Sequence, residues 1–162
     1  MGLDILAYSG LRKDKELTYK LNKEKSHLEY EGDELIMYPQ LEYIEETFPN
    51  RANPLKYNGD AYNFDSCESF NIGSYSTYNS FRQELEMFAD SIGTQDFDEL
   101  INFSDCEGVI GCILCQKLYD AFDFYEDEFE KYVVGFGFTM RIYRNFKHAF
   151  KIGKDNGAVE FC

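Results

Sequence analysis

The stretch Ser76-Thr-Tyr-Asn-Ser-Phe-Arg-Gln-Glu-Leu-Glu-Met-Phe-Ala-Asp-Ser-Ile-Gly93 is the most regular part of this sequence. Its apolar residues recur every three or four positions, which is the period of an amphipathic helix. These residues are Tyr78, Phe81, Leu85, Phe88 and Ile92. Ser76 or Thr77 is typical of an N-cap, and Gly93 is typical of a helix C-terminus. The stretch therefore predicts an α-helix with one buried face.

Two further helices are predicted downstream by the same periodicity. One begins at about Gly111 and is expected to bury Ile113, Leu114, Leu118, Ala121, Phe122, Tyr125 and Phe129. The other runs from about Phe138 to Ile152 and is expected to bury Ile142, Phe146, Ala149 and Phe150. After a turn at Asp155-Asn-Gly157, Ala158–Phe161 is predicted to form a closing strand.

Upstream of these helices, the pattern indicates short strands and loops. Gly2–Tyr8 alternates as an opening strand, and the lysine-rich residues 13–25 form a loop or a short exposed helix. Residues 27–31 and 34–38 are predicted to form a hairpin, and three prolines divide residues 39–59 into loops. We therefore predict one α+β domain over residues 1–162. It has a small, mainly antiparallel sheet and about three helices in the second half.

Negative charge is concentrated in the middle of the chain. The formal net charge is −14, and residues 26–110 hold three Lys or Arg against eighteen Asp or Glu. Such a segment has few cations with which to release phosphate counterions, so we expect no direct binding to nucleic acid. The acidic segment could imitate nucleic acid toward a protein partner, but high solubility is the simpler explanation.

Five cysteines, an odd number, favour free thiols over a disulfide framework. The first residues lack the basic and apolar regions of a signal peptide, and no apolar run approaches the roughly 20 residues of a membrane span. We therefore expect a protein of a reducing cytoplasm that does not associate with membranes. The pair Cys112 and Cys115 has C-x-x-C spacing, but one such pair in apolar sequence predicts packed thiols rather than a redox or zinc site.

The block Gly73-Ser-Tyr-Ser-Thr-Tyr-Asn79, followed by Arg82, is the first candidate ligand site. A helix N-terminus offers unpaired N–H groups to an anion, and arginine binds phosphate through two hydrogen bonds. The tyrosines could stack on a base or a sugar. The predicted ligand-binding residues here are Ser74, Tyr75, Ser76, Tyr78, Asn79 and Arg82. An ordinary capped helix with buried tyrosines is the alternative.

Ser104-Asp-Cys-Glu-Gly108 is the second candidate site, because Asp105 and Glu107 place two carboxylates in a glycine-rich turn. They could accept hydrogen bonds from ribose hydroxyls, bind a divalent metal or do acid–base work. They could also only stabilise the turn. No Walker-type loop, nucleophile elbow or zinc-protease motif occurs, and we predict neither a cofactor nor a bound metal.

These same blocks carry a family resemblance. The start Met1-Gly-Leu-Asp-Ile5, the Gly73–Arg82 block, Glu99–Gly111 and the ending Asn156–Phe161 resemble uncharacterised proteins encoded by bacteriophages and prophages. The likeness leaves residues 12–65 unmatched. It implies a phage context, a location in the host bacterial cytoplasm and a counter-defence role. The family has Pro in place of Cys112 and His in place of Cys162, which implies no catalytic role for those cysteines.

Three functions follow as hypotheses. The leading one is a binding protein for a nucleotide-like small molecule, such as a sponge for an immune signal, with Asp105 and Glu107 on the ribose. The second is a metal-assisted nucleotide hydrolase or transferase that uses the same two carboxylates. The third is an acidic inhibitor that imitates nucleic acid toward a host protein. The sequence favours a binding protein over an enzyme, and its many tyrosines are compatible with a homodimer.

Overall fold

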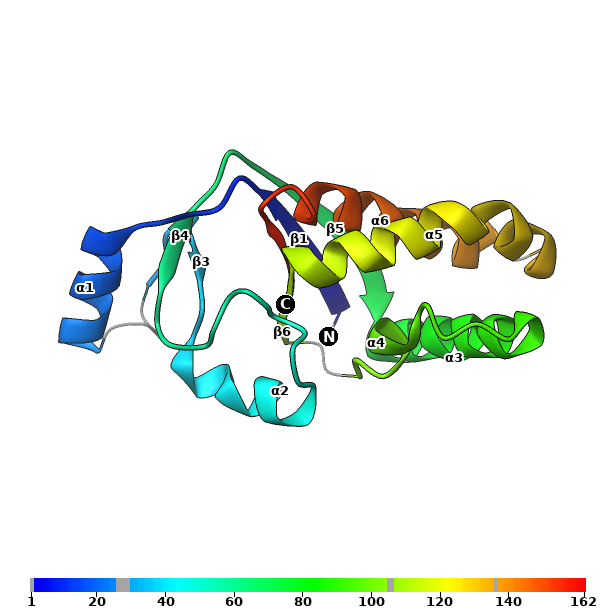
Figure 1. Cartoon of the computed structure of the whole chain (residues 1–162), viewed down its shortest axis with the longest axis horizontal. Helices are drawn as coiled ribbons and strands as arrows, with labels where there is room; N and C mark the ends of the chain where they lie inside the picture. Colours follow the sequence, from blue (N-terminus) through cyan, green and yellow to red (C-terminus); the bar gives the residue numbers. More distant parts are fainter. Residues whose placement is uncertain (1, 26–29, 105–106, 136) are drawn as a thin grey trace.

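The structure is a computed structural model that describes residues 2–25, 30–104, 107–135 and 137–162. It has two antiparallel sheets (Figure 1). The larger sheet has the strand order β5-β1-β7-β6 and the smaller has the order β2-β4-β3. The predicted α+β class is confirmed, because the long helices pack on one sheet and are not interleaved between parallel strands.

The larger sheet is built around the first strand, β1 (Gly2–Ser9). β1 pairs on one side with β5 (Ser66–Ser74) and on the other with β7 (Ala158–Phe161), so the two ends of the chain lie next to each other. The fourth strand, β6 (Gly108–Gly111), pairs with β7 at the edge. Because side chains alternate along a strand, one face of this sheet carries buried apolar residues and the other carries more polar ones.

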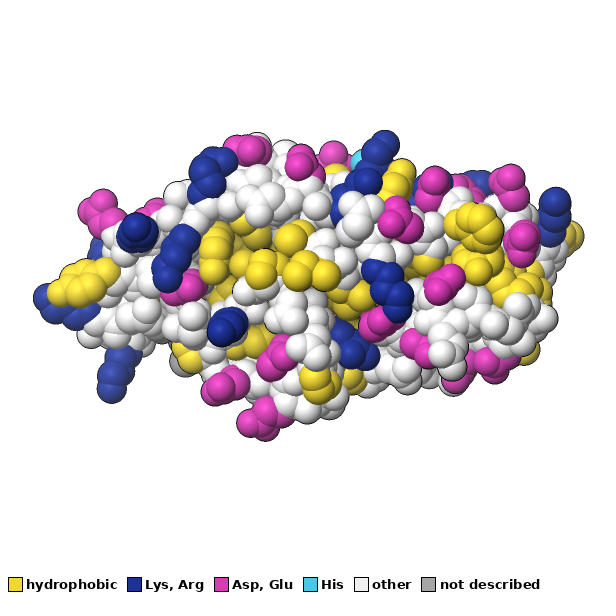
Figure 2. Space-filling view, viewed as in Figure 1, with side chains coloured by type: hydrophobic (Ala, Val, Ile, Leu, Met, Phe, Trp, Pro, Cys, Tyr) yellow, Lys and Arg dark blue, Asp and Glu magenta, His cyan; other side chains and the backbone are white. Residues whose placement is uncertain are grey.

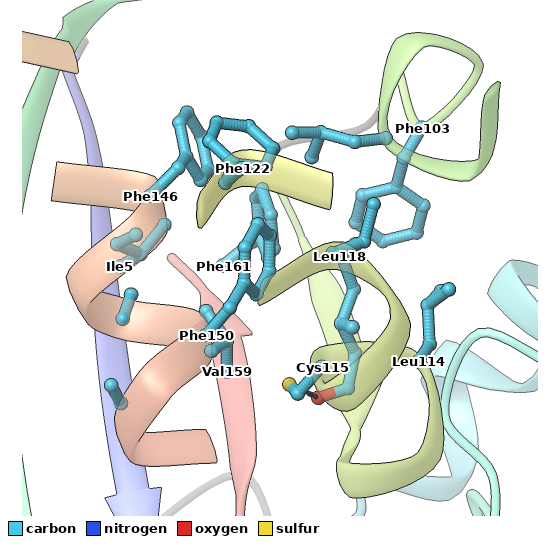
Figure 3. Packing of buried hydrophobic residues seen from close by; sticks show 14 of the residues in the cluster. Ile5, Phe103, Leu114, Cys115, Leu118, Phe122, Phe146, Phe150, Val159 and Phe161 are labelled. Atoms are coloured by element: carbon cyan, nitrogen blue, oxygen red, sulfur yellow. Dashed lines mark hydrogen bonds between the residues drawn. The ribbon is translucent and has the colours of Figure 1, made fainter. Parts of the chain in front are cut away.

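The apolar face is covered by three long helices, namely α3 (Tyr75–Ile92), α5 (Cys112–Tyr132) and α6 (Gly137–Gly153). A short helix, α4 (Asp98–Ile101), lies beside α3. The core between them is aromatic. Figure 3 shows Phe122 of α5, Phe146 and Phe150 of α6 and Phe161 of β7 gathered together, all at most 2% exposed.

The second sheet belongs to a small lobe, which we define as residues 12–63. Its strands are β2 (Arg12–Lys13), β3 (Leu35–Ile36) and β4 (Ala61–Asn63). Its helices are α1 (Lys15–Glu24), the 3-10 turn η2 (Pro39–Leu41) and α2 (Glu42–Thr47). In Figure 1 the lobe lies at the end of the molecule opposite the tips of α3, α5 and α6.

Contacts with β6 fix the lobe to the larger sheet. The Gly111 N–H donates to the carbonyl of Arg51 at 2.8 Å. A Cβ at Gly111 would lie only 2.1 Å from the carbonyl oxygen of Asn53, so this close approach of two backbones requires glycine. The loop after α2 therefore packs directly against the edge of the larger sheet.

Most of the predicted regular elements are confirmed. The opening strand, the closing strand and the three long helices lie within one or two residues of their expected bounds, and Gly93 ends α3 with a φ of 69°. Residues 15–24 form the short exposed helix that the lysine-rich stretch allowed.

Several local predictions were wrong. The N-cap of α3 is Ser74 rather than Ser76 or Thr77, because the chain leaves β5 with an extended backbone at Ser74 and its side chain accepts the Thr77 N–H. Ile113 is 63% exposed, since it lies on the outer face of the first turn of α5. Tyr125 is only partly buried.

The predicted hairpin does not form among the described residues. β3 pairs with β4, which lies some 25 residues further on, and residues 30–31 are not in a strand. Residues 27–29 of that prediction lie outside the described residues. Residues 39–59 are not all loop, since they contain η2 and α2. The strands β5 and β6 were not predicted.

Basic side chains of α6 are paired with acidic side chains of α5. Arg144 binds Glu126 and Glu130 at 3.0 Å, and Lys147 binds Asp123 and Glu126. These acids offset the positive charge of Arg144 and Lys147. Within the described part of the chain, no helix is long and apolar enough to span a membrane.

Candidate functional site

A cavity of about 540 Å³ lies between the small lobe and the edge of the larger sheet. Pockets of roughly 300–1,000 Å³ are typical of small-molecule sites. The lobe contributes Tyr38, Leu41 and Tyr57, the sheet contributes Val109 and Phe161, and α3 contributes Tyr75. On the face in Figure 2, hydrophobic side chains gather in the middle of the molecule, over the junction of lobe and sheet. We call this cavity the inter-sheet pocket.

Glu160 of β7 and Glu107 are the two carboxylates among the described residues that line the pocket. Val159 and Phe161, the neighbours of Glu160, point into the core, so strand alternation places Glu160 on the opposite face of the sheet. There it accepts a hydrogen bond at 2.7 Å from the hydroxyl of Tyr8 on β1. Burial raises the pKa of Glu160, and the bond from Tyr8 partly opposes this shift.

Glu160 lacks a cationic partner among the described residues. Within residues 2–25, 30–104, 107–135 and 137–162, no Lys, Arg or His lies within salt-bridge distance of Glu160, and no Lys or Arg lines the pocket. Buried carboxylates are usually paired with a cation or several donors. The pocket therefore has an acceptor that is suited to N–H or O–H donors and unsuited to phosphate.

Tyr57 supplies a hydroxyl to the same pocket. Its oxygen accepts the backbone N–H of Val109 at 2.9 Å, and the side chain is 7% exposed. Burial above all raises the pKa of Tyr57 to about 12, so the hydroxyl keeps its proton at neutral pH. Because Val109 uses only an acceptor position of the oxygen, the hydroxyl proton remains available to donate.

Two of the predicted ligand-binding residues, Tyr75 and Glu107, line this pocket. Tyr75 is 47% exposed at the first turn of α3, and Glu107 accepts a hydrogen bond from Tyr43 at 3.3 Å. Asp105, which was predicted to act together with Glu107, lies outside the described residues. The structure thus brings one residue from each predicted block into a single cavity.

The remaining residues of the Gly73–Arg82 block are engaged elsewhere. Ser74 caps α3, and its hydroxyl lies 2.8 Å from that of Ser76. Ser76 lines a separate cavity of about 300 Å³ between α3 and α6. Tyr78 is 1% exposed and donates to the carbonyl of Phe103 at 2.6 Å.

Arg82 holds α4 against α3. One of its terminal nitrogens donates to the carbonyl of Ile101 at 2.7 Å, and the other donates to Asn79 at 2.9 Å. The guanidinium also lies 5.0 Å from the ring centroid of Tyr78. Arg82 lies seven positions after Tyr75 in α3, which is about 10 Å along the helix axis. The expected phosphate contact stays a prediction, but these partners give Arg82 a structural role.

Sequence reasoning did not find Glu160, Tyr8, Tyr38 or Tyr57. Glu160 gave the one available signal, since it is a carboxylate inside an otherwise apolar strand of four residues. The tyrosines gave no such signal, because they lie up to 152 residues from Glu160 in the sequence and come near it only in the folded chain.

The cysteines and the acids provide no further centre in the described part of the chain. Cys115 is fully buried, donates to the carbonyl of Ile110 and has a pKa raised by burial, while Cys112 is also a free thiol. Among the residues that the structure describes, no group of three His, Cys, Asp or Glu side chains is close enough to hold a metal ion. The metal-assisted reaction and the imitation of nucleic acid stay hypotheses.

Comparison of the chain with models of protein families, with curated proteins and with solved structures finds no match.

Proposed function

We propose that this protein binds a nucleotide-like small molecule in the inter-sheet pocket, and that binding rather than catalysis is its role. One observation carries the proposal: a cavity of about 540 Å³ surrounds a largely buried carboxylate with aromatic side chains. Ligand sites combine such an apolar wall with a few polar groups that fix orientation.

The pocket suits the base of such a ligand better than its phosphates. The rings of Tyr38, Tyr57 and Tyr75 offer apolar surface to a planar ring, and Glu160 and Tyr57 offer hydrogen-bonding groups. A phosphate beside Glu160 would meet negative charge without a compensating cation. Any phosphate therefore projects from the pocket toward solvent. A sponge for a phage-related immune signal remains the biological role that the sequence resemblance suggests.

Native mass spectrometry of protein purified gently from bacteria, compared with a denatured sample, tests the proposal. We expect a bound small molecule that is released on denaturation. A protein that carries no ligand, and that gains none from a panel of linear and cyclic nucleotides and nucleosides, would contradict a binding role.

A pair of tyrosine variants locates the bound molecule. Tyr75 and Tyr19 are both exposed on the first half of a helix, at 47% and 67%, but only Tyr75 lines the pocket. We expect Tyr75→Ala to lose most of the bound ligand and Tyr19→Ala to retain it. Equal retention by both variants would place the ligand elsewhere.

A further inference from the structure

The two edges of the larger sheet differ in how they are covered. The strand order β5-β1-β7-β6 places β5 and β6 at the edges. The lobe covers the β6 edge, where the Gly111 N–H donates to the carbonyl of Arg51. No strand of the described part of the chain pairs with the outer side of β5, and its first four residues, Ser66 to Ser69, are all exposed. The β5 edge is therefore open.

The hydrogen bonds of β1 decide which backbone groups of β5 point outward. Asp4 exchanges two hydrogen bonds with Cys162, at 2.9 and 3.0 Å, so the N–H and C=O of Asp4 face β7. Asn71 lies opposite Asp4 on the other side, so its own backbone groups point away from β1. The side chains of Arg141 and Asn145 on α6 agree with this direction, because both donate to the Asn71 carbonyl at 3.3 Å.

The same alternation turns the backbone of Ser69 and Cys67 outward, since they lie two and four residues before Asn71. A row of outward N–H and C=O groups is a template for pairing with another strand. Proteins usually block such an edge with Lys, Pro or a bulge. β5 contains neither Lys nor Pro, and its irregularity lies at the far end, opposite Leu3 and Asp4. The stretch from Cys67 to Asn71 is therefore competent to pair.

We infer that this edge pairs with β5 of a second copy of the chain, antiparallel across a two-fold axis at Ser69. The two four-stranded sheets then join into one continuous sheet. Ser69 of each copy exchanges both backbone hydrogen bonds with Ser69 of the other, and Cys67 lies opposite Asn71. Because both copies use the same strand, the contact closes on itself and assembly stops at two copies.

The charges beside the edge favour a second copy as the occupant. Arg141 forms no ion pair with the described residues, and its contacts are the Asn71 carbonyl and the ring of Phe138. In the proposed pairing, Glu68 lies one position from the residue that faces Asn71 of the second copy. Each Glu68 is therefore brought beside the other copy's Arg141. An axis at Glu68 would instead set two like charges directly opposite each other, which is destabilising.

Sedimentation velocity of the full chain over a wide range of concentrations tests the pairing. We expect a species of about twice the 19.0 kDa of one chain. Ser69→Pro removes the outward N–H and leaves the bonds to β1 in place, since proline is tolerated where an edge strand's N–H faces solvent. Each dimer loses two hydrogen bonds, so we expect dimerisation at least about tenfold weaker. Ser69→Ala, which keeps the N–H, is the matched control and should dimerise as the natural chain does.

A charge exchange tests the register. Glu68→Arg sets two cations side by side and occurs twice in each dimer, so we expect dimerisation about tenfold weaker. Adding Arg141→Glu to the same chain should restore it. Circular dichroism confirms that each variant is folded.

A mass of one chain at every concentration would overturn the inference. So would assemblies that keep growing with concentration, or a dimer that Ser69→Pro and Ser69→Ala affect equally. Failure of Arg141→Glu to restore the dimer in the Glu68→Arg chain would overturn the axis at Ser69.

Discussion

Replacing Arg82 with alanine separates two roles for the residue that carries the sequence-predicted phosphate site. In the structure the guanidinium donates to Ile101 at 2.7 Å and to Asn79 at 2.9 Å, and it lies over Tyr78. These contacts join α4 to α3. If they are its function, Arg82→Ala lowers stability and leaves ligand binding intact.

The expected loss follows from these contacts. A hydrogen bond from a charged donor contributes about 1.5–3 kcal/mol, and a partly exposed cation–π contact about 0.5–1 kcal/mol. The half-buried position of Arg82 favours the lower values, and its buried Nε has no partner among the described residues, which offsets part of the gain. We therefore expect a loss of about 2 kcal/mol, or roughly 4–8 °C in Tm for a chain of this size.

Urea unfolding followed by circular dichroism measures the loss, and native mass spectrometry measures the retained ligand. Arg141→Ala is the matched control, since Arg141 is exposed on α6, lies over Phe138 and makes one long hydrogen bond of 3.3 Å. Its expected cost is below about 1 kcal/mol. Unchanged stability together with a lost ligand in Arg82→Ala would refute the structural role and support the phosphate contact.

Three further substitutions test the core, the junction of lobe and sheet, and the pocket. Tyr78→Phe leaves the buried carbonyl of Phe103 without its 2.6 Å donor and should cost about 1–3 kcal/mol in urea unfolding; a loss below about 0.5 kcal/mol would contradict this. Gly111→Ala would place a Cβ 2.1 Å from the carbonyl oxygen of Asn53, so we expect a loss of about 1–3 kcal/mol and weaker ligand retention, measured by the same two methods. Burial raises the folded-state pKa of Glu160, so the folded protein holds this proton more tightly, and stability falls as pH rises from about 4.5 through the raised value. Glu160→Gln should therefore gain stability relative to the natural protein across that window; a difference that is constant with pH would contradict this.

The elements that could be predicted from sequence are those with a strong hydrophobic period. α3, α5 and α6 each bury one face against the sheet, so their apolar residues recur at helical spacing. β5 could not be predicted in this way, because it lies at the sheet edge and only Ile72 is fully buried among its nine residues. β6 has four residues with glycine at both ends, a pattern more typical of a turn.

The site was less predictable than the fold, because the residues that line the pocket are far apart in the sequence. Tyr75 and Glu107 were found because they lie in compact motifs, and both line the pocket. Tyr38 and Tyr57 come from a lobe whose sequence predicted mainly loops. Their place in the pocket depends on how the lobe packs on β6. That packing is fixed by the close approach of the lobe backbone to Gly111 and not by any local motif.

Glu160 is the position at which stability and binding make opposite demands. A desolvated carboxylate without a cation lowers the stability of the folded protein at neutral pH, and its bond to Tyr8 offsets only part of that effect. Because the stability gain expected for Glu160→Gln follows from burial alone, it is expected whether or not Glu160 binds a ligand. A binding role predicts, in addition, that the folded variant retains less of the ligand. Ligand retention measured by native mass spectrometry therefore distinguishes the roles, and unchanged retention in Glu160→Gln would contradict a binding role for this carboxylate.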